Sequence, residues 1–384
     1  MKHFNRLTST MRSSGIQEIF ELSQNIKGCI HLEVGQPDFR TPENILEAAS
    51  QAAKDGFTRY TAAAGIYELR EAIAEKVSKK NGFKTEAKNV VVSPGAVCSI
   101  ISSLLAVAEP GDEILIPDPA WPNYIMQMAC IGCTGVRYHL DPSLGFQPDF
   151  DYLENLVTPK TKAMIINTPG NPTGAVLSRE TIQKIVEFTK KHDLFLISDE
   201  VYEEIIFGGE HTSVGCYNDD GRIATVFGFS KTYAIPGLRL GYVVCEEKMA
   251  SIIEKIQTPV VSCPTSISQK ACLEALKGPQ EPVYEMVKVY KERRDAVIEI
   301  LKKNDLWLYT PNGAFYILID ISKTGMSSTD FAFELLRGKK VAVAPGDTFG
   351  ETTKSFVRIS FTLDTEKLVE GVNILCDRIN AGRS

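Results

Sequence analysis

The stretch Leu194-Phe195-Leu196-Ile197-Ser198-Asp199 runs from four apolar residues directly into a polar residue and a carboxylate. A short apolar run of this kind is typical of a strand that is covered on both faces. The next such run, Ala224-Thr225-Val226-Phe227, leads into Gly228-Phe229-Ser230-Lys231. Two neighbouring buried strands are therefore expected to end in an acid and a lysine, and such side chains are rarely buried without partners.

Further strands and helices are expected to alternate around this pair. Strands are predicted at residues 90–92, 113–116, 136–138 and 163–166, and helices at about 97–106, 124–129 and 180–191. This alternation indicates βαβ units and a mostly parallel sheet, and the apolar strands indicate helices on both faces. We predict an α/β protein whose large domain is a three-layer α/β/α structure.

The last third of the chain differs from the middle. It predicts a long helix at about residues 283–303, strands at 314–318 and 356–360, and a final helix at about 365–379. These elements suggest a smaller C-terminal α/β domain. We divide the chain into an N-terminal arm that packs with the small domain, a large domain and a small domain, at residues 1–40, 41–282 and 283–384.

Ligands of an open α/β sheet bind beyond the carboxyl ends of its strands. After the first predicted strand, Ser93-Pro94-Gly95-Ala96 combines a glycine with the free amides of a helix start, which suits a phosphate. The rigid turn Asn167 to Gly174 would hold Asn171 at the same edge, although a plain loop is the alternative. Asp199 is a candidate acid, with a helix cap as the alternative.

Two cations follow at this edge. Burial at the end of a strand would lower the pKa of Lys231 and favour nucleophilic chemistry. Arg239 lies in Pro236-Gly237-Leu238-Arg239-Leu240-Gly241-Tyr242 and is expected to begin the next strand, with a surface cation as the alternative. A lysine, an acid, an arginine and a phosphate cradle together match the needs of pyridoxal 5′-phosphate, abbreviated PLP.

Composition also narrows the possible partners and the cellular location of the protein. The 384 residues are 43% hydrophobic and carry a net charge of −6 without a basic block, so we expect no nucleic-acid partner. We expect no membrane span, because no apolar run approaches the ~18 residues required, and the polar N-terminus predicts no signal peptide. The nine cysteines favour reduced thiols in the cytoplasm. We treat Cys130-x-x-Cys133 as a coincidence and expect no metal site.

The sequence resembles, nearly from end to end, the class I and II aminotransferases of PLP fold type I. The resemblance rests on motifs that follow one another in order. They are Val34 to Phe39, Tyr60 to Gly65, Leu69-Arg70, Pro110 to Glu113, Pro119 to Tyr124, Asn171 to Gly174, Ser198 to Tyr202, Ser230-Lys231, Gly237 to Tyr242, Gly313 to Tyr316 and Val357 to Ser360.

The resemblance implies how the cofactor ring would be held. Lys231 resembles the lysine that forms the Schiff base, and Asp199 the partner of the pyridine nitrogen. Tyr202 resembles the donor to the ring's 3-oxygen, with Asn171 also near that oxygen. Trp121 is similar to the aromatic residue that stacks on the ring. Lys231, Asp199 and Tyr202 would be the catalytic residues.

The phosphate site implied by the resemblance consists of the backbone of Ala96 and Val97 with Ser230 and Arg239. Tyr60 is similar to a tyrosine that reaches the phosphate in the neighbouring subunit. The resemblance therefore implies a homodimer with shared active sites.

The substrate site implied by the resemblance is centred on Arg358, whose planar fork suits a carboxylate. Asn171, Trp121 and the backbone at Gly35 would assist it. The implied reaction moves the amino group of an L-amino acid to a 2-oxo acid with ping-pong kinetics.

Of two alternatives, the first stays open, and the second is disfavoured by the acidic net charge and by the early start of the pattern. One is a PLP-dependent C–S β-lyase of the same fold. The other is a PLP-sensing regulator, which would need a DNA-binding domain before residue 30, where the pattern begins. The donor side chain is expected to meet residues 13–16, Val97, Tyr124 and Tyr60, and Val97 favours a neutral or hydrophobic donor.

Overall fold

The computed structural model describes residues 4–9, 11 and 15–382, and its centre is an eight-stranded sheet. The strand order is β2-β9-β8-β7-β6-β3-β4-β5. The strands are β2 (Val90–Ser93), β3 (Glu113–Asp118), β4 (Thr134–Asp141), β5 (Gln147–Pro148), β6 (Thr161–Asn167), β7 (Phe195–Asp199), β8 (Ile223–Gly228) and β9 (Gly241–Val244).

Most neighbouring strands of this sheet are parallel, as the alternating pattern predicts. β9 is the exception next to the site, because it runs antiparallel to both β2 and β8. The prediction that Arg239 begins this strand was wrong. Arg239 has a positive φ of 50° and lies in the turn before Gly241, where β9 starts.

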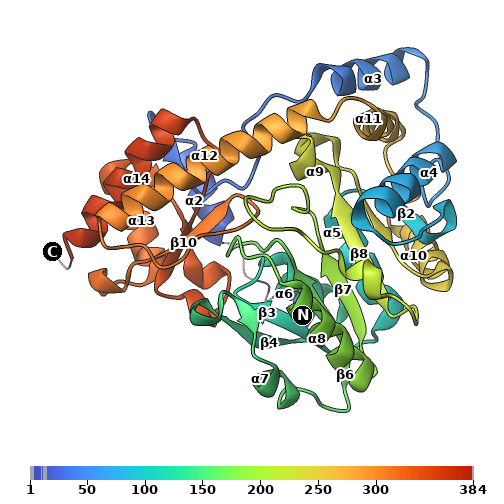
Figure 1. Cartoon of the computed structure of the whole chain (residues 1–384), viewed down its shortest axis with the longest axis horizontal. Helices are drawn as coiled ribbons and strands as arrows, with labels where there is room; N and C mark the ends of the chain where they lie inside the picture. Colours follow the sequence, from blue (N-terminus) through green and yellow to red (C-terminus); the bar gives the residue numbers. More distant parts are fainter. Residues whose placement is uncertain (1–3, 10, 12–14, 383–384) are drawn as a thin grey trace.

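Helices cover both faces of the large sheet (Figure 1). Alternate residues of one strand face opposite layers, so Ile165 packs in a different cluster from Met164 and Ile166. The prediction of a three-layer α/β/α structure is confirmed. The helices are α3 (Glu43–Lys54), α4 (Tyr67–Lys76), α5 (Ala96–Val107), α6 (Asn123–Ile131), α7 (Phe150–Glu154), α8 (Arg179–Lys191), α9 (Phe229–Thr232), α10 (Glu247–Val261) and α11 (Ser266–Lys277).

A second, smaller sheet lies in the C-terminal part of the chain. Its order is β10-β13-β12, with antiparallel pairs between β10 (Tyr316–Asp320), β13 (Phe356–Ser360) and β12 (Ala344–Pro345). In Figure 1 the long helix α12 (Glu281–Lys303) reaches from this region toward α9. The other helices here are α13 (Ser328–Lys339) and α14 (Thr365–Asn380).

The N-terminal residues pack against this smaller sheet region. β1 (Ile30–His31) pairs in parallel with β11 (Val341–Ala342), and α2 (Gly15–Ser23) contacts α13. The helix α1 (Arg6–Ser9) instead contacts α6. The division of the chain at residues 40 and 282 stays a prediction.

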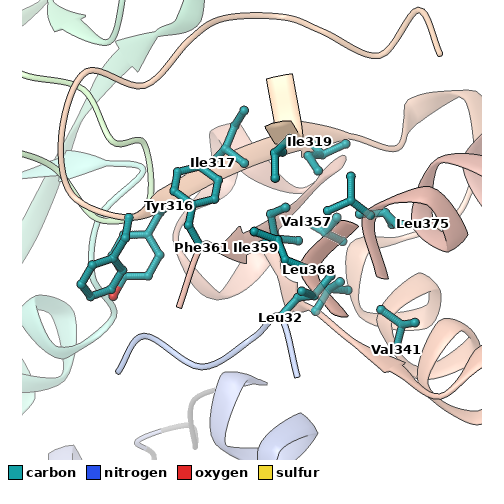
Figure 2. Packing of buried hydrophobic residues seen from close by; sticks show 14 of the residues in the cluster. Leu32, Tyr316, Ile317, Ile319, Val341, Val357, Ile359, Phe361, Leu368 and Leu375 are labelled. Carbon is teal, nitrogen blue, oxygen red and sulfur yellow. The ribbon is translucent and has the colours of Figure 1, made fainter. Parts of the chain in front are cut away.

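The small sheet has a continuous hydrophobic core, shown in Figure 2. Val357 and Ile359 of β13 point into this core with Leu32 and Leu368. Arg358 lies between them in the strand, so its side chain leaves on the opposite face. The hydrophobic pattern of β13 thereby aims one arginine at the large sheet.

Candidate active site

A cavity of about 270 Å³ lies where the large sheet meets the small sheet. Its floor is formed by residues at or just beyond the carboxyl ends of β2, β6, β7 and β8, and Arg358 and Tyr316 close one side. The structure therefore brings together residues from four separate strand ends, as expected for ligands of an open α/β sheet.

Lys231 lies in α9, directly beyond the end of β8. Its Nζ donates a hydrogen bond of 2.7 Å to the backbone oxygen of Gly35. Burial, together with the positive charges of Arg358 and Arg239, lowers the pKa of Lys231 to about 8. An amine with this pKa is available as a nucleophile or base near neutral pH.

Asp199 is the last residue of β7 and is 3% exposed. Its Oδ2 accepts a hydrogen bond of 2.6 Å from the Tyr124 hydroxyl, and its Oδ1 accepts one of 3.3 Å from the amide of Val201. Burial raises the pKa of Asp199 to about 6, although these hydrogen bonds oppose the rise. A buried carboxylate of this kind favours a cationic partner in the cavity.

The alternative interpretation of Asp199 as a helix cap was wrong. The described residues that follow it, 200–204, form turns and no helix. Its carboxylate accepts hydrogen bonds from one amide of that turn, that of Val201, and from the Tyr124 hydroxyl.

The Gly95 end of the cavity consists of Gly95, Ala96, Val97, Ser230 and Arg239. Gly95 precedes α5 with φ at 82°, and a Cβ there would lie 2.7 Å from Nη2 of Arg239. The first amides of α5, those of Ala96 and Val97, have no acceptor within the helix. Free amides beside a guanidinium form a site for a phosphate group.

The Arg358 end consists of Arg358, Asn171, Gly35 and Tyr316. Arg358 is buried, and its Nη1 donates to Oδ1 of Asn171 at 3.1 Å while Nη2 donates to the backbone oxygen of Glu33. Its Nε is buried and has no partner among the described residues. Arg358 lines the cavity, and its guanidinium suits a carboxylate ligand there.

Two tyrosine hydroxyls link the Arg358 end of the cavity to the turn that follows β7. The hydroxyls of Tyr202 and Tyr316 lie 3.0 Å apart. The Arg358 guanidinium lies 4.4 Å from the centre of the Tyr316 ring. A Cβ at Gly35 would overlap the Tyr316 hydroxyl, so only glycine lets the backbone approach so closely.

Of the site residues predicted from sequence, only Tyr60 lies away from the cavity. Its side chain is 89% exposed. Of the predicted donor pocket, Ile16, Val97 and Tyr124 line the cavity, whereas residues 13 and 14 lie outside the described part of the chain. The predicted residues that line the cavity are Gly35, Ala96, Val97, Trp121, Asn171, Asp199, Tyr202, Ser230, Lys231, Arg239 and Arg358.

Sequence reasoning gave no role to Tyr316 or Asn167, and it placed Tyr124 in the donor pocket without its contact to Asp199. Asn167 holds the backbone of Asn171 through a bond of 2.7 Å from the Asn171 amide to its Oδ1. Tyr124 meets Trp121 edge to face as well as Asp199. The only signal for Tyr124 was its spacing of three residues from Trp121 at the start of a helix.

Features expected to be unrelated to the site lie apart from it. All nine cysteines are free thiols, and Cys133 donates to the backbone oxygen of Glu109. In the described ranges, 4–9, 11 and 15–382, no group of three or more His, Cys, Asp or Glu side chains could hold a metal ion. Across those residues, no helix is both long and apolar enough to cross a membrane.

The fold and the site define an α/β enzyme with a reactive lysine, a buried acid and separate places for a phosphate and a carboxylate. Comparison with known proteins identifies the family. The model of the family described as aminotransferase class I and II matches residues 27–375. The chain therefore belongs to the class I and II aminotransferases and is a transferase, and this family is generally PLP-dependent.

Curated and solved relatives agree with this assignment. The chain is 38% identical to aromatic-amino-acid aminotransferase 2 of Thermococcus litoralis, over 94% of each chain. It is 37% identical to an aspartate aminotransferase of Thermotoga maritima, over 92% of each. A Thermus thermophilus aspartate aminotransferase solved with maleate superposes with a TM-score of 0.94 at 32% identity, covering 99% of this chain and 100% of that one. These names favour amino-group transfer over the C–S lyase alternative.

Proposed function

We propose that this aminotransferase holds PLP on Lys231 and moves amino groups from neutral or hydrophobic L-amino acids to 2-oxo acids in a ping-pong cycle. The observation that supports this most directly is one cavity containing both an amine of lowered pKa and a buried carboxylate of raised pKa. The PLP ring, when bound, supplies an aldehyde for the amine and withdraws electrons from the substrate.

The residues present fit this cofactor. Asp199 would meet a protonated ring nitrogen, whose positive charge would offset the cost of burying the carboxylate. Trp121 would pack on the ring, and the Tyr202 hydroxyl would donate to the ring's oxygen. The amides of Ala96 and Val97, with Ser230 and Arg239, would bind the phosphate, because the Gly95 end presents free N–H groups and a cation.

The chain's own residues would then handle the substrate. Arg358 binds the α-carboxylate with the help of Asn171 and orients the α-carbon over the site. The Lys231 amine would be the group that accepts the proton from that α-carbon and later gives it up again. Closure of the cavity by Tyr316 and Trp121 limits the access of water.

The proposed donor class follows from the charges of the cavity. Its cationic lining residues in the described part of the chain are Lys231, Arg239 and Arg358. Each already has a role toward the cofactor or the α-carboxylate, so this chain offers no described cation to a second carboxylate. The apolar Ile16 and Val97 would instead face the donor side chain.

A panel of amino donors with 2-oxoglutarate and pyruvate as acceptors tests this proposal. We expect phenylalanine, tyrosine or leucine to exceed aspartate in kcat/KM. High activity with aspartate and little with the others would refute the donor class. Both outcomes have a precedent among the relatives, because one is named for aromatic amino acids and another for aspartate.

We also propose a cytoplasmic homodimer in which Tyr60 reaches the partner's phosphate. Its 89% exposure supports this, because a phenol so far from its own cavity is free to contact another subunit. The nine free thiols suit a reducing compartment. Light scattering should give a dimer mass, and Tyr60→Phe should lose PLP on dialysis faster than the control Tyr67→Phe.

A further inference from the structure

Asp118 lies at the end of β3, outside the set of residues that line the cavity. It is fully buried, with 0% exposure. No role in the proposed chemistry accounts for it. A buried carboxylate needs compensating donors, and those of Asp118 come from a segment more than two hundred residues away.

The donors belong to the loop that joins β12 to β13 of the small sheet. The amide of Glu351 donates to Oδ2 of Asp118 at 3.1 Å, and the amide of Thr352 to Oδ1 at 3.3 Å. The Thr352 hydroxyl adds a third bond of 2.7 Å. The carboxylate thus holds three donors of one short turn.

Two further groups next to the large sheet hold the same loop one turn earlier. The backbone oxygen of Phe349 accepts a bond of 2.9 Å from the amide of Ala120 and one of 3.2 Å from Nη1 of Arg137. Arg137 also lies 3.8 Å from Asp118. We call Asp118, Ala120 and Arg137, with residues 349–352, the Asp118 latch.

Phe349 connects the Asp118 latch to the Arg358 end of the cavity. Phe349 is fully buried, and the Arg358 guanidinium lies 4.9 Å from the centre of its ring. Tyr316 lies 4.4 Å from the same guanidinium, so two aromatic rings hold the cation. The position of Phe349 therefore helps to set the direction of Arg358.

We infer that Asp118 is a positioning residue for substrate binding: it fixes the loop that carries Phe349 and thereby orients Arg358 toward the substrate carboxylate. This inference rests on the proposed role of Arg358. It predicts that a change at Asp118 weakens carboxylate binding without changing the chemistry at Lys231.

Asp118→Asn in the PLP-loaded enzyme tests the inference. The two loop amides bind different oxygens of Asp118, and the amide nitrogen of Asn cannot accept a hydrogen bond, so one of the two N–H groups loses its acceptor and meets a second donor. KM for amino donors and the inhibition constant of propanoate should both rise about tenfold, with kcat retained. The matched control is Asp149→Asn, since Asp149 also accepts two backbone amides but within one short helix. An equal change in both variants, or a loss of kcat instead of KM, would overturn the inference.

Gly350 offers a second variant on the opposite side of the latch. A Cβ at Gly350 would overlap Oδ1 of Asp118. Gly350→Ala should therefore raise KM in the wild-type background but add little in Asp118→Ala, where the carboxylate is gone. Additive effects would show that Gly350 and Asp118 act independently and would contradict the latch.

Hydrogen exchange separates failure of the latch from failure of the proposed function. At least one of the amides of Glu351 and Thr352 should exchange faster in Asp118→Asn than in wild type, and both should in Asp118→Ala, whatever reaction the enzyme performs. Unchanged exchange would refute the latch even in an active aminotransferase. If wild type transferred no amino group, the proposed function would fail, and the exchange result would still decide the latch.

Discussion

The Gly95 end and the Arg358 end of the cavity differ in how far apart in the chain their parts lie. At the Gly95 end, a glycine turn and two helix-start amides are consecutive, and Ser230 and Arg239 both come from the one segment that joins β8 to β9. At the Arg358 end, the guanidinium is held by Glu33, Asn171, Tyr316 and Phe349 from four distant segments. Local backbone geometry supplies the amides of the first end, which consists of two chain segments, whereas long-range packing of four segments builds the second.

The largest effect should come from the Arg358 end. Arg358→Ala should raise KM for amino donors by about 100-fold, because it removes a buried, charged hydrogen-bonding group. Retention of PLP should not change, since the two ends are built separately. Steady-state kinetics and dialysis against buffer measure the two properties. Loss of PLP together with substrate binding would mean that the ends are not independent.

A smaller effect is expected at the Gly95 end. Arg239→Gln should weaken PLP binding by about tenfold, because the amides of Ala96 and Val97 still bind the phosphate. At saturating PLP its KM for donors should match wild type. Fluorescence titration of the cofactor-free protein measures the affinity. A raised KM at full saturation would place Arg239 in the substrate site instead.

The smallest effect concerns Lys231, which lies between the two ends. Its ordinary pKa of 10.5 falls to about 8 in the folded protein. Between these pH values the unfolded chain holds a proton that the folded chain lacks, so stability without PLP should rise with pH in this window. Relative to Lys231→Met, the melting temperature should rise by roughly 2 °C from pH 8 to 10. Parallel curves would contradict the lowered pKa.

The same contrast explains what the sequence could predict. The strands and their terminal residues followed from apolar runs, so Asp199 and Lys231 could be recognised as site candidates at one sheet edge. The antiparallel direction of β9 could not be predicted, because Gly241 to Val244 reads like any buried strand. Arg239 was consequently assigned to the strand rather than to the turn before it.

Most of the contacts that sequence reasoning missed cross between distant segments. Tyr124 reaches Asp199, Tyr316 reaches Tyr202, and Asp118 reaches Thr352. No periodicity or local motif encodes such pairs. The Tyr124–Asp199 pair depends on how α6 packs against the large sheet, and the other two depend on how the small sheet is placed against the large one. Arg358 was recognised by its motif, whereas the residues that hold it became visible only in the folded chain.

The most direct test of the account is to locate the cofactor on the chain. Borohydride reduction of the PLP-loaded enzyme, followed by digestion and mass spectrometry, should find the pyridoxyl group on the peptide containing Lys231. Lys231→Ala treated in the same way should carry none and should not transfer amino groups. A pyridoxyl group on another lysine of wild type, or an active Lys231→Ala enzyme, would contradict the central claim.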